Sequence, residues 1–254
     1  MRKVGRVLVS ITAFLVVWKG ASFVAPAFFP PPDTVVGTAI DFSVNGDIRG
    51  RSALWHLSLT LWRVALATGV AVGLSVVIGI LMGLSSTVED IVSFWLPIWM
   101  TPPDIVVILV TMIVVGFNTT AVVLAVSFVY TPFGLVNIWE GVQDIEGDLV
   151  EMAGAFDADQ WLMWRRVFVP QLLSYIFAAV RYVFGMTWKV AVIAEVLGID
   201  AGVGAQIRFW YTQGEVAMVL AYTVLFVGVV LLIEYGGLQP IQRRAFAWRT
   251  MASE

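Results

Sequence analysis

Residues Leu59–Leu84 have the sequence LTLWRVALATGVAVGLSVVIGILMGL, and no charged side chain occurs between Arg63 and Glu89. An α-helix rises about 1.5 Å per residue, so roughly 20 apolar residues cross the roughly 30 Å hydrocarbon core of a bilayer. This segment is long enough and apolar enough to do so. It therefore predicts a transmembrane helix and indicates a helical membrane protein.

The composition of the whole chain points the same way. The 254 residues are 59% hydrophobic and 13% charged, and the mean hydropathy is +0.89. A soluble domain carries about 25% charged residues. Half that charge cannot cover a water-facing surface of this size, so lipid must cover part of it. We expect a single transmembrane domain over residues 1–254, with no separate soluble domain.

Other charge-poor stretches extend the prediction to about six spans. These are residues 7–24, 59–84, 91–116, 121–139, 172–197 and 216–233. Between residues 91 and 139 the only charge is Asp104, and the length fits two helices divided near Gly116. Pro97, Pro102 and Pro103 lie early in the third span. Because proline has no backbone N–H, a kinked or late-starting helix is expected there.

The first of these stretches has a second interpretation. The basic residues Arg2 and Lys3, the apolar run from Val7 and the Ala25-Pro-Ala27 sequence are also typical of a secretory signal with a cleavage site. Lys19 interrupts the apolar run. We therefore favour a retained first span.

Residues 140–170 are too polar to cross a membrane. The charged residues there are Glu140, Asp144, Glu146, Asp148, Glu151, Asp157, Asp159, Arg165 and Arg166. Several apolar residues fall between them at helical spacing, which predicts an amphipathic helix outside the lipid core. Such a helix either lies on the membrane surface or docks a partner.

Basic residues predict the orientation of the chain. Lys and Arg in short loops favour the cytoplasmic side. With an even number of spans, one side collects Arg2, Lys3, Arg6, Arg165, Arg166, Arg243, Arg244 and Arg249. The other side collects only Arg49, Arg51 and Arg208. Both termini and the loop at residues 140–170 are therefore expected in the cytoplasm.

Several kinds of site are not expected. The chain has no cysteine, which excludes disulfides, thiolate metal ligands and a cysteine nucleophile. His56 is the only histidine, so neither a metal site nor a histidine-based triad is expected, and a position at a helix end is the simpler interpretation. The net charge of -3 gives no basic surface for nucleic acid.

A motif within residues 151–170 resembles the loop signature of inner-membrane permease subunits of binding-protein-dependent ABC importers. That signature is Glu-Ala-Ala, three residues, Gly, nine residues, then Ile-x-Leu-Pro. The corresponding residues are Glu151, Met152, Ala153, Asp157, Val167, Val169 and Pro170. Glu151, Ala153 and Pro170 match, the two valines are conservative, and Met152 replaces an alanine. Asp157 replaces the family glycine, which puts the tight turn at that point in question.

The similarity extends along most of the chain and is greatest to the nitrate/sulfonate/taurine-type permeases. Further segments occur in the order expected for them: Pro30-Pro-Pro32, His56-Leu-Ser-Leu-Thr-Leu-Trp-Arg63, Gly116-Phe117, Ala194-Glu195 and Gly202-Val-Gly204. The resemblance implies the type I ABC importer permease fold. It also implies a cytoplasmic coupling helix, within Leu149–Arg165, between the fourth and fifth spans.

The resemblance also implies the partners of the chain. These are two cytoplasmic ABC ATPase subunits, an external solute-binding protein and a second permease copy in a homodimer, all at a bacterial inner membrane. The chain has no G-x-x-x-x-G-K-[ST] phosphate loop. ATP and Mg are therefore expected on the ATPase, with no cofactor and no catalysis in this chain. The implied solute is a small anion such as a sulfonate or nitrate.

Lys189, Trp188 and Glu195 in the fifth span are candidate residues of the translocation path. A lysine at mid-bilayer costs about 2.5–3.5 kcal/mol on insertion scales, so it is seldom idle. Lys189 either faces the path and attracts an anion, or is buried against another helix or reaches to the interface. For Glu195 we favour a structural partner over a solute contact. The stretch Gly69–Gly83 has four glycines, Gly69, Gly73, Gly79 and Gly83, and close helix packing, which the spacing of Gly69 and Gly73 permits, is favoured over a gate.

Two other classes of function remain. A self-sufficient secondary carrier or channel usually has inverted repeats or paired broken helices, and no clear repeat is found. A membrane-embedded enzyme needs clustered acids or histidines in its spans, and the acids here are scattered. Genes for a phosphate-loop ATPase and a secreted binding protein beside this one would favour the importer.

Overall fold

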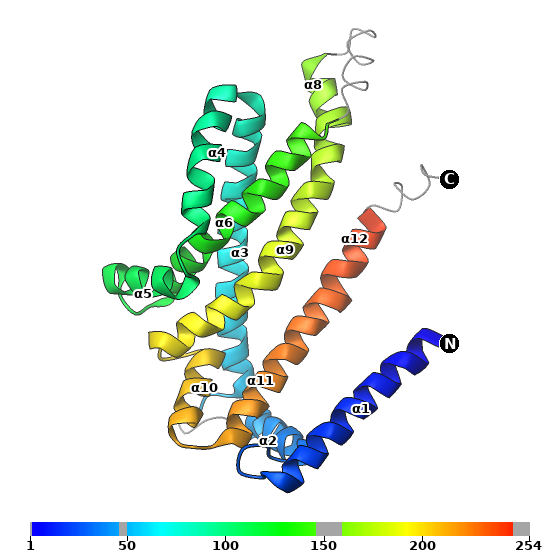
Figure 1. The fold of residues 1–254 in the computed structure, drawn as a ribbon, viewed down its shortest axis with the longest axis vertical. Helices are drawn as coiled ribbons and strands as arrows, with labels where there is room; N and C mark the ends of the chain where they lie inside the picture. Colours follow the sequence, from blue (N-terminus) through cyan, green and yellow to red (C-terminus); the bar gives the residue numbers. More distant parts are fainter. Residues whose placement is uncertain (1, 46–49, 146–158, 246–254) are drawn as a thin grey trace.

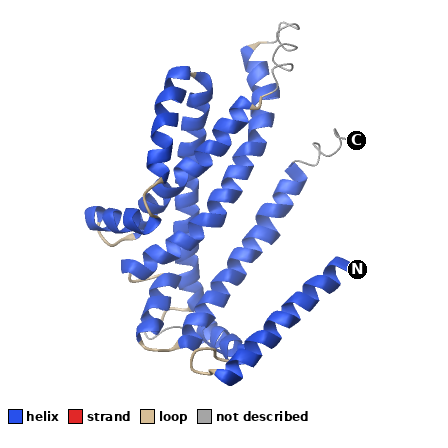
Figure 2. Cartoon of the chain, viewed as in Figure 1, coloured by secondary structure: helices blue, strands red, loops and turns tan. Residues whose placement is uncertain are grey.

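The computed structural model describes residues 2–45, 50–145 and 159–245, and the described part is helical throughout, with no strand in it (Figures 1 and 2). In chain order the elements are α1 (Arg2–Val24), α2 (Pro32–Asn45), α3 (Ala53–Leu84), α4 (Ser86–Met100), α5 (Asp104–Val115), α6 (Thr119–Gln143), α8 (Gln160–Met163), η1 (Trp164–Phe168), α9 (Val169–Gly198), α10 (Val203–Thr212), α11 (Val216–Leu231), η2 (Leu232–Leu238) and α12 (Gln239–Ala245). The elements η1 and η2 are π-helical.

Within the described residues, five helices are long and apolar enough to cross a membrane. They are Gly5–Val24, Ala53–Leu84, Thr119–Gln143, Val169–Gly198 and Val216–Gln242. The pair α4 and α5 passes the same test only when taken together, across a bend of 94°. Counted as one broken span, this pair brings the candidate spans to six, so the predicted class of an all-α membrane protein with about six transmembrane helices is confirmed.

The third predicted span is broken rather than kinked. Helix α4 ends at Met100, α5 begins at Asp104, and α5 points away from the side of the bundle (Figure 1). Pro102 and Pro103 occupy the break. Neither has an N–H to donate, so the backbone hydrogen bonds of α4 cannot continue through them, and the chain leaves the helix after Thr101, which still has the α conformation. Asp104 starts the new helix.

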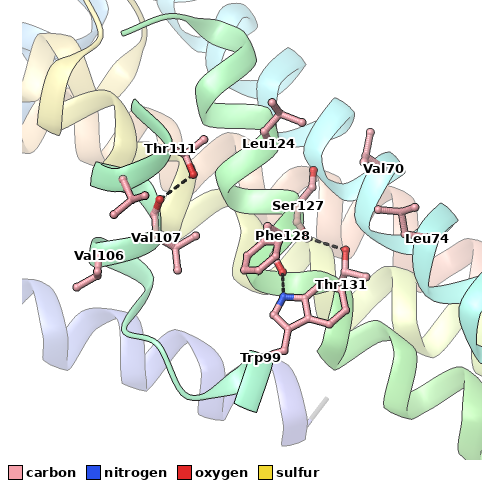
Figure 3. Close-up of a pocket in the computed structure, with 11 residues that line it drawn as sticks. Val70, Leu74, Trp99, Val106, Val107, Thr111, Leu124, Ser127, Phe128 and Thr131 are labelled. Atoms are coloured by element: carbon pink, nitrogen blue, oxygen red, sulfur yellow. Dashed lines mark hydrogen bonds between the residues drawn. The ribbon is translucent and has the colours of Figure 1, made fainter. Parts of the chain in front are cut away.

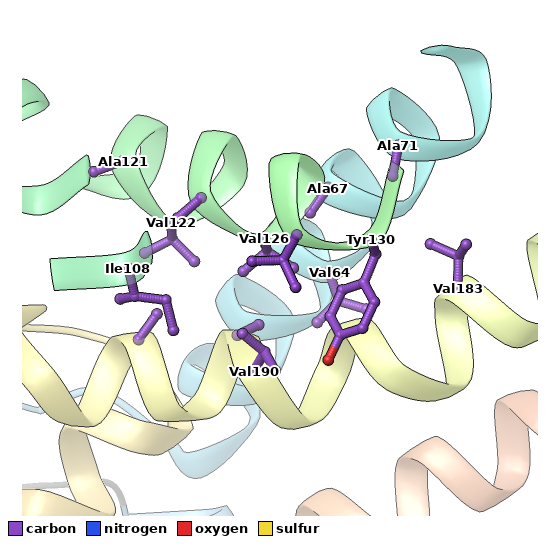
Figure 4. Packing of buried hydrophobic residues seen from close by; sticks show 14 of the residues in the cluster. Val64, Ala67, Ala71, Ile108, Ala121, Val122, Val126, Tyr130, Val183 and Val190 are labelled. Atoms are coloured by element: carbon purple, nitrogen blue, oxygen red, sulfur yellow. The ribbon is translucent and has the colours of Figure 1, made fainter. Parts of the chain in front are cut away.

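Helices α3, α6 and α9 form the centre of the bundle (Figure 1). Figure 4 shows the buried cluster between them, to which α6 contributes Val122 and Val126 and α9 contributes Val183 and Val190. Alanines such as Ala67 on α3 let the backbones approach closely.

Of the four glycines in the stretch Gly69–Gly83, two pack closely against α6 and two do not. Gly69 and Gly73 are exposed, and a Cβ at either would meet nothing within 4 Å in the described structure. The close approach is at Gly79, where a Cβ would lie 2.7 Å from Ile138 Cγ2 on α6, and at Gly83, where it would overlap Val142. Spacing alone did not show which face of α3 meets α6.

Each π-helical segment precedes a proline by the same interval. Pro170 lies two residues after η1 ends at Phe168, and Pro240 lies two residues after η2 ends at Leu238. In an α-helix the proline ring clashes with the carbonyl four residues earlier, and the proline offers no hydrogen bond to it. A wider π turn relieves that clash. A proline thus follows each irregular segment, whereas Pro97 and Pro132 lie inside α4 and α6 without a π turn.

Helix α1 is attached to the rest of the chain at its C-terminal part. Trp18 Nε1 donates to the Pro30 carbonyl at 3.1 Å, and Lys19 Nζ donates to Asp33 Oδ1 at 2.5 Å. This hydrogen bond from Lys19 lowers the pKa of the Asp33 carboxyl below its ordinary value. Most of α1 is exposed, for example Val9 at 69% and Val17 at 71%.

Candidate functional site

The predicted coupling residues are only partly described. Glu151, Met152, Ala153 and Asp157 lie outside the described residues. Val167 lies in η1, Val169 begins α9 with its side chain 49% exposed, and Pro170 follows it. The coupling role of all seven residues stays a prediction.

The described end of this segment is continuous with the fifth span. Helix α8, the π-helical η1 and α9 follow one another without a break from Gln160 to Gly198. These three elements form one continuous helical rod, Gln160–Gly198, which also carries the charged residues Arg181 and Lys189 of α9.

Arg63 and Glu195 form a buried ion pair near the α10 end of the bundle. Arg63 Nη1 lies 2.5 Å from Glu195 Oε1, and the side chains are 3% and 0% exposed. The same guanidinium donates to the Ala201 carbonyl at 2.6 Å and to Thr119 Oγ1 at 3.1 Å. One arginine thus joins α3 to α9, to the start of α6 and to the α9–α10 connection.

Glu195 is fully satisfied in the same cluster. Its carboxylate also accepts hydrogen bonds from Thr60 Oγ1 at 2.9 Å and from the Gly204 amide at 2.9 Å. Gly202 has a φ of +122°, and a Cβ there or at Gly204 would overlap Glu195. The Gly202-Val-Gly204 sequence therefore lets the start of α10 reach the carboxylate. These are the contacts of a structural partner, and the assignment of Glu195 to a translocation path finds no support in this geometry.

A second pair of opposite charges lies nearer the middle of the spans. Arg181 Nε donates to Glu234 Oε1 at 2.7 Å, and Arg181 Nη1 donates to Gln242 Oε1 at 3.1 Å. These contacts join α9 to η2 and α12. The pair was missed in the sequence because Glu234 seemed to mark the end of the last apolar stretch. The signal that could have predicted the pair was one basic and one acidic residue, Arg181 and Glu234, each in an otherwise apolar helical segment.

This pair borders a cavity between α9 and the last span, with a volume of about 510 Å³. Its polar and aromatic lining residues are Arg181, Tyr182, Phe184, Trp188, Glu234, Tyr235 and Gln242. Charged side chains at this depth usually face a bundle interior or a water-filled cavity and mark solute pathways. The cavity is therefore the candidate site for a polar solute.

The structure separates Glu195 from the other two predicted path residues, Trp188 and Lys189. Trp188 lines the cavity and packs edge-to-face on Phe226, with ring centroids 5.6 Å apart. Lys189 is exposed on α9, and its Nζ lies 5.7 Å from the Trp188 ring centroid. Glu195 is buried in the other cluster. Lys189 thus presents its charge next to the cavity wall.

A larger pocket, of about 620 Å³, lies among α3, α4, α5 and α6 (Figure 3). The polar groups in it are already bonded to backbone carbonyls. Trp99 Nε1 donates to Phe128 at 3.0 Å, and the hydroxyls of Thr111, Ser127 and Thr131 donate one turn back along their helices. This pocket offers a solute hydrocarbon surface alone, so it is a poor site for an anion.

Comparisons with known proteins agree with one another. The family model described as "Binding-protein-dependent transport system inner membrane component" matches residues 75–242. A putative aliphatic sulfonates transport permease of Bacillus subtilis (strain 168) is 25% identical over 239 residues, 92% of this chain and 84% of the relative. The taurine transport system permease of Escherichia coli (strain K12) is 25% identical over 246 residues, which are 94% of this chain and 88% of the relative. A nitrate import permease of Leptolyngbya laminosa is 23% identical over 206 residues, which are 80% of this chain and 74% of the relative.

Solved structures give a similar picture of the fold. An inward-facing form of the MetNI methionine ABC transporter aligns with a TM-score of 0.61 at 20% identity, covering 76% of this chain and 97% of that one. An amino acid ABC transporter crystallised with histidines aligns with a TM-score of 0.63 at 21% identity, covering 76% and 93%.

Proposed function

Since the chain belongs to the family of binding-protein-dependent transport system inner membrane components, it is the permease of a transport system, and we propose that it forms the path for a small oxyanion in an ATP-driven importer. Its fold is that of type I ABC importer permeases. Relatives named for sulfonates, taurine and nitrate support an oxyanion as the solute.

The proposed importer has the partners that the sequence implied. Two copies of this chain form the membrane part, two ABC ATPase subunits bind ATP and Mg in the cytoplasm, and an external binding protein delivers the solute. The chain itself catalyses no reaction. We place it in a bacterial inner membrane with both termini in the cytoplasm, supported by the basic residues at those ends.

The observation that carries this proposal is the continuous rod from α8 through η1 to α9. A helix transmits displacement along its length, and this one carries Arg181, Trp188 and Lys189. Closure of the ATPase pair on ATP binding would push on the segment before Gln160. The rod would then move the charged face of α9 against the last span and change access to the cavity.

The test is co-purification of the chain in mild detergent with the ATPase encoded beside it. The wild type is compared with Glu151→Ala and with a deletion of residues 149–165. We expect the ATPase to co-purify with the wild type and to be lost with the deletion. In proteoliposomes, uptake should require both ATP and the binding protein.

The matched control is Glu215→Ala, the same substitution at an exposed residue before α11. It should retain the ATPase. If no ATPase associates and the chain alone moves solute in liposomes, the importer proposal is wrong and a secondary carrier takes its place.

A further inference from the structure

The two ion pairs of the bundle differ in their access to solvent. Arg63 and Glu195 are 3% and 0% exposed, whereas the side chains of Arg181 and Glu234 are 38% and 18% exposed. Only the second pair borders a cavity among those described for the structure. The first pair is closed to a ligand, and the second is open to one.

Arg181 and Glu234 lie within two helices that are long and apolar enough to span a membrane, Val169–Gly198 and Val216–Gln242. An unpaired guanidinium at that depth is costly, so it needs an anionic partner whenever no ligand is present. Glu234 supplies that partner at 2.7 Å. An anion site within a membrane needs a counterion for its arginine when no anion is bound, and Glu234 meets that need.

The guanidinium keeps donors for a ligand. Arginine has five N–H groups in a planar fork, which matches the oxygen geometry of a carboxylate or another oxyanion. Among the described residues, Arg181 uses one N–H on Glu234 and one on Gln242. An oxyanion in the cavity would accept the others and compete with the Glu234 carboxylate for the same fork.

Glu234 lies in a segment whose backbone departs from α-helical hydrogen bonding. It lies in η2, whose π turns precede Pro240. π-helical turns are rare in proteins, and those that occur are often found at functional sites. The contacts of Arg181 with Glu234 and Gln242 hold this segment and α12 across the cavity from α9.

We propose that Arg181 is an oxyanion site and that Glu234 is its exchangeable counterion. A sulfonate or similar oxyanion replaces the Glu234 carboxylate on the guanidinium, and no covalent bond forms or breaks. Release of Glu234 breaks the ion pair that ties η2 to α9, while Gln242 of α12 keeps its own contact with Arg181, so arrival of the anion is linked to movement of η2 in the last span. This inference rests on the proposed function, because it places the site in the solute path.

The test is equilibrium binding of radiolabelled ethanesulfonate to the importer, or to the full-length chain alone, in lipid nanodiscs. Glu234→Gln removes the competing charge and keeps the size of the side chain. We expect it to bind ethanesulfonate about tenfold more tightly than the wild type, the effect of about one charge-assisted hydrogen bond. Arg181→Gln should lose binding, and Arg181→Lys should bind more weakly than the wild type.

Glu215→Gln is the matched control, because it makes the same change at an exposed residue at the start of the same span. It should bind as the wild type does. Unlabelled dimethyl sulfone, an uncharged analogue, should not compete. A gain in affinity cannot come from a damaged protein, so the Glu234→Gln result is decisive even if Arg181→Gln fails to fold.

Equal or weaker binding by Glu234→Gln overturns the proposal, as does wild-type affinity in Arg181→Gln. ATPase co-purification reports separately on the proposed function. If the ATPase does not associate but Glu234→Gln still binds more tightly, the importer is wrong and the anion site stands. If the ATPase associates and Glu234→Gln gains nothing, the importer stands and this site is wrong.

Discussion

Arg63 and Glu195 lie 132 residues apart in the chain, yet their side chains form an ion pair 2.5 Å long in the buried part of the bundle. The pair joins α3 to α9, and the amide of Gly204 adds the start of α10. The other polar partners described for the pair, Thr60, Thr119, Ala201 and Gly204, lie at the same end of the bundle as α10. The cluster therefore fixes that end of the bundle as one unit.

Removing one partner of this pair should destabilise the protein strongly. In Glu195→Ala the Arg63 guanidinium stays buried without its carboxylate, and breaking a buried pair in this way costs about 3–5 kcal/mol. We expect a large drop in melting temperature in detergent, measured by loss of the monodisperse peak after heating. Glu215→Ala is the control and should melt as the wild type does. Unchanged melting of Glu195→Ala would show that the pair contributes nothing to stability.

Two glycine-to-alanine changes should have opposite results. In Gly204→Ala the new methyl group overlaps the Val192 carbonyl and the Glu195 side chain, and overpacking of this kind costs about 1–3 kcal/mol. In Gly69→Ala the methyl group meets nothing within 4 Å, and alanine is the better helix former. Melting temperature should fall in the first variant and stay level or rise in the second. The reverse order would contradict the packing described for α10.

Lys189→Gln should weaken transport of an anion without affecting assembly. If the exposed ammonium beside Trp188 attracts the solute, as proposed, loss of this charged contact raises KM for ethanesulfonate by about tenfold. Uptake kinetics in proteoliposomes measure this effect, and ATPase co-purification confirms assembly. Lys189→Arg keeps the charge and should stay close to the wild type. Unchanged kinetics in an assembled Lys189→Gln importer would remove Lys189 from the path.

The contact between α1 and α2 should not depend on pH near neutrality. The hydrogen bond from Lys19 lowers the pKa of Asp33 below 3.8, so the contact is complete above that pH and is lost as pH falls through the lowered value. A spin-label distance between Val16 and Val36 should stay constant from about pH 8 to about pH 5. Asp33→Asn should lengthen it at every pH. A distance that changes between those pH values would point to another titrating group.

Much of the fold could be predicted from local properties of the chain. Hydropathy is carried by each segment separately, so the helical membrane class and about six spans followed from the sequence. Prolines act on the backbone beside them, which is why a disturbance near Pro102 was predictable. The loop signature at residues 151–170 pointed to the family that the comparisons later identified.

Only the tertiary structure decided how the charged residues and glycines of the spans are used. Apolar helices have little amphipathic pattern, so their sequences do not define how each is rotated about its axis or how far it is shifted along its neighbour. Those two quantities bring Arg63 to Glu195 and Arg181 to Glu234, and they turn Gly79 rather than Gly69 toward α6. The sequence by itself determined which segments cross the membrane. Packing between distant helices determined which charges meet, because contact depends on rotation and depth that no single segment encodes.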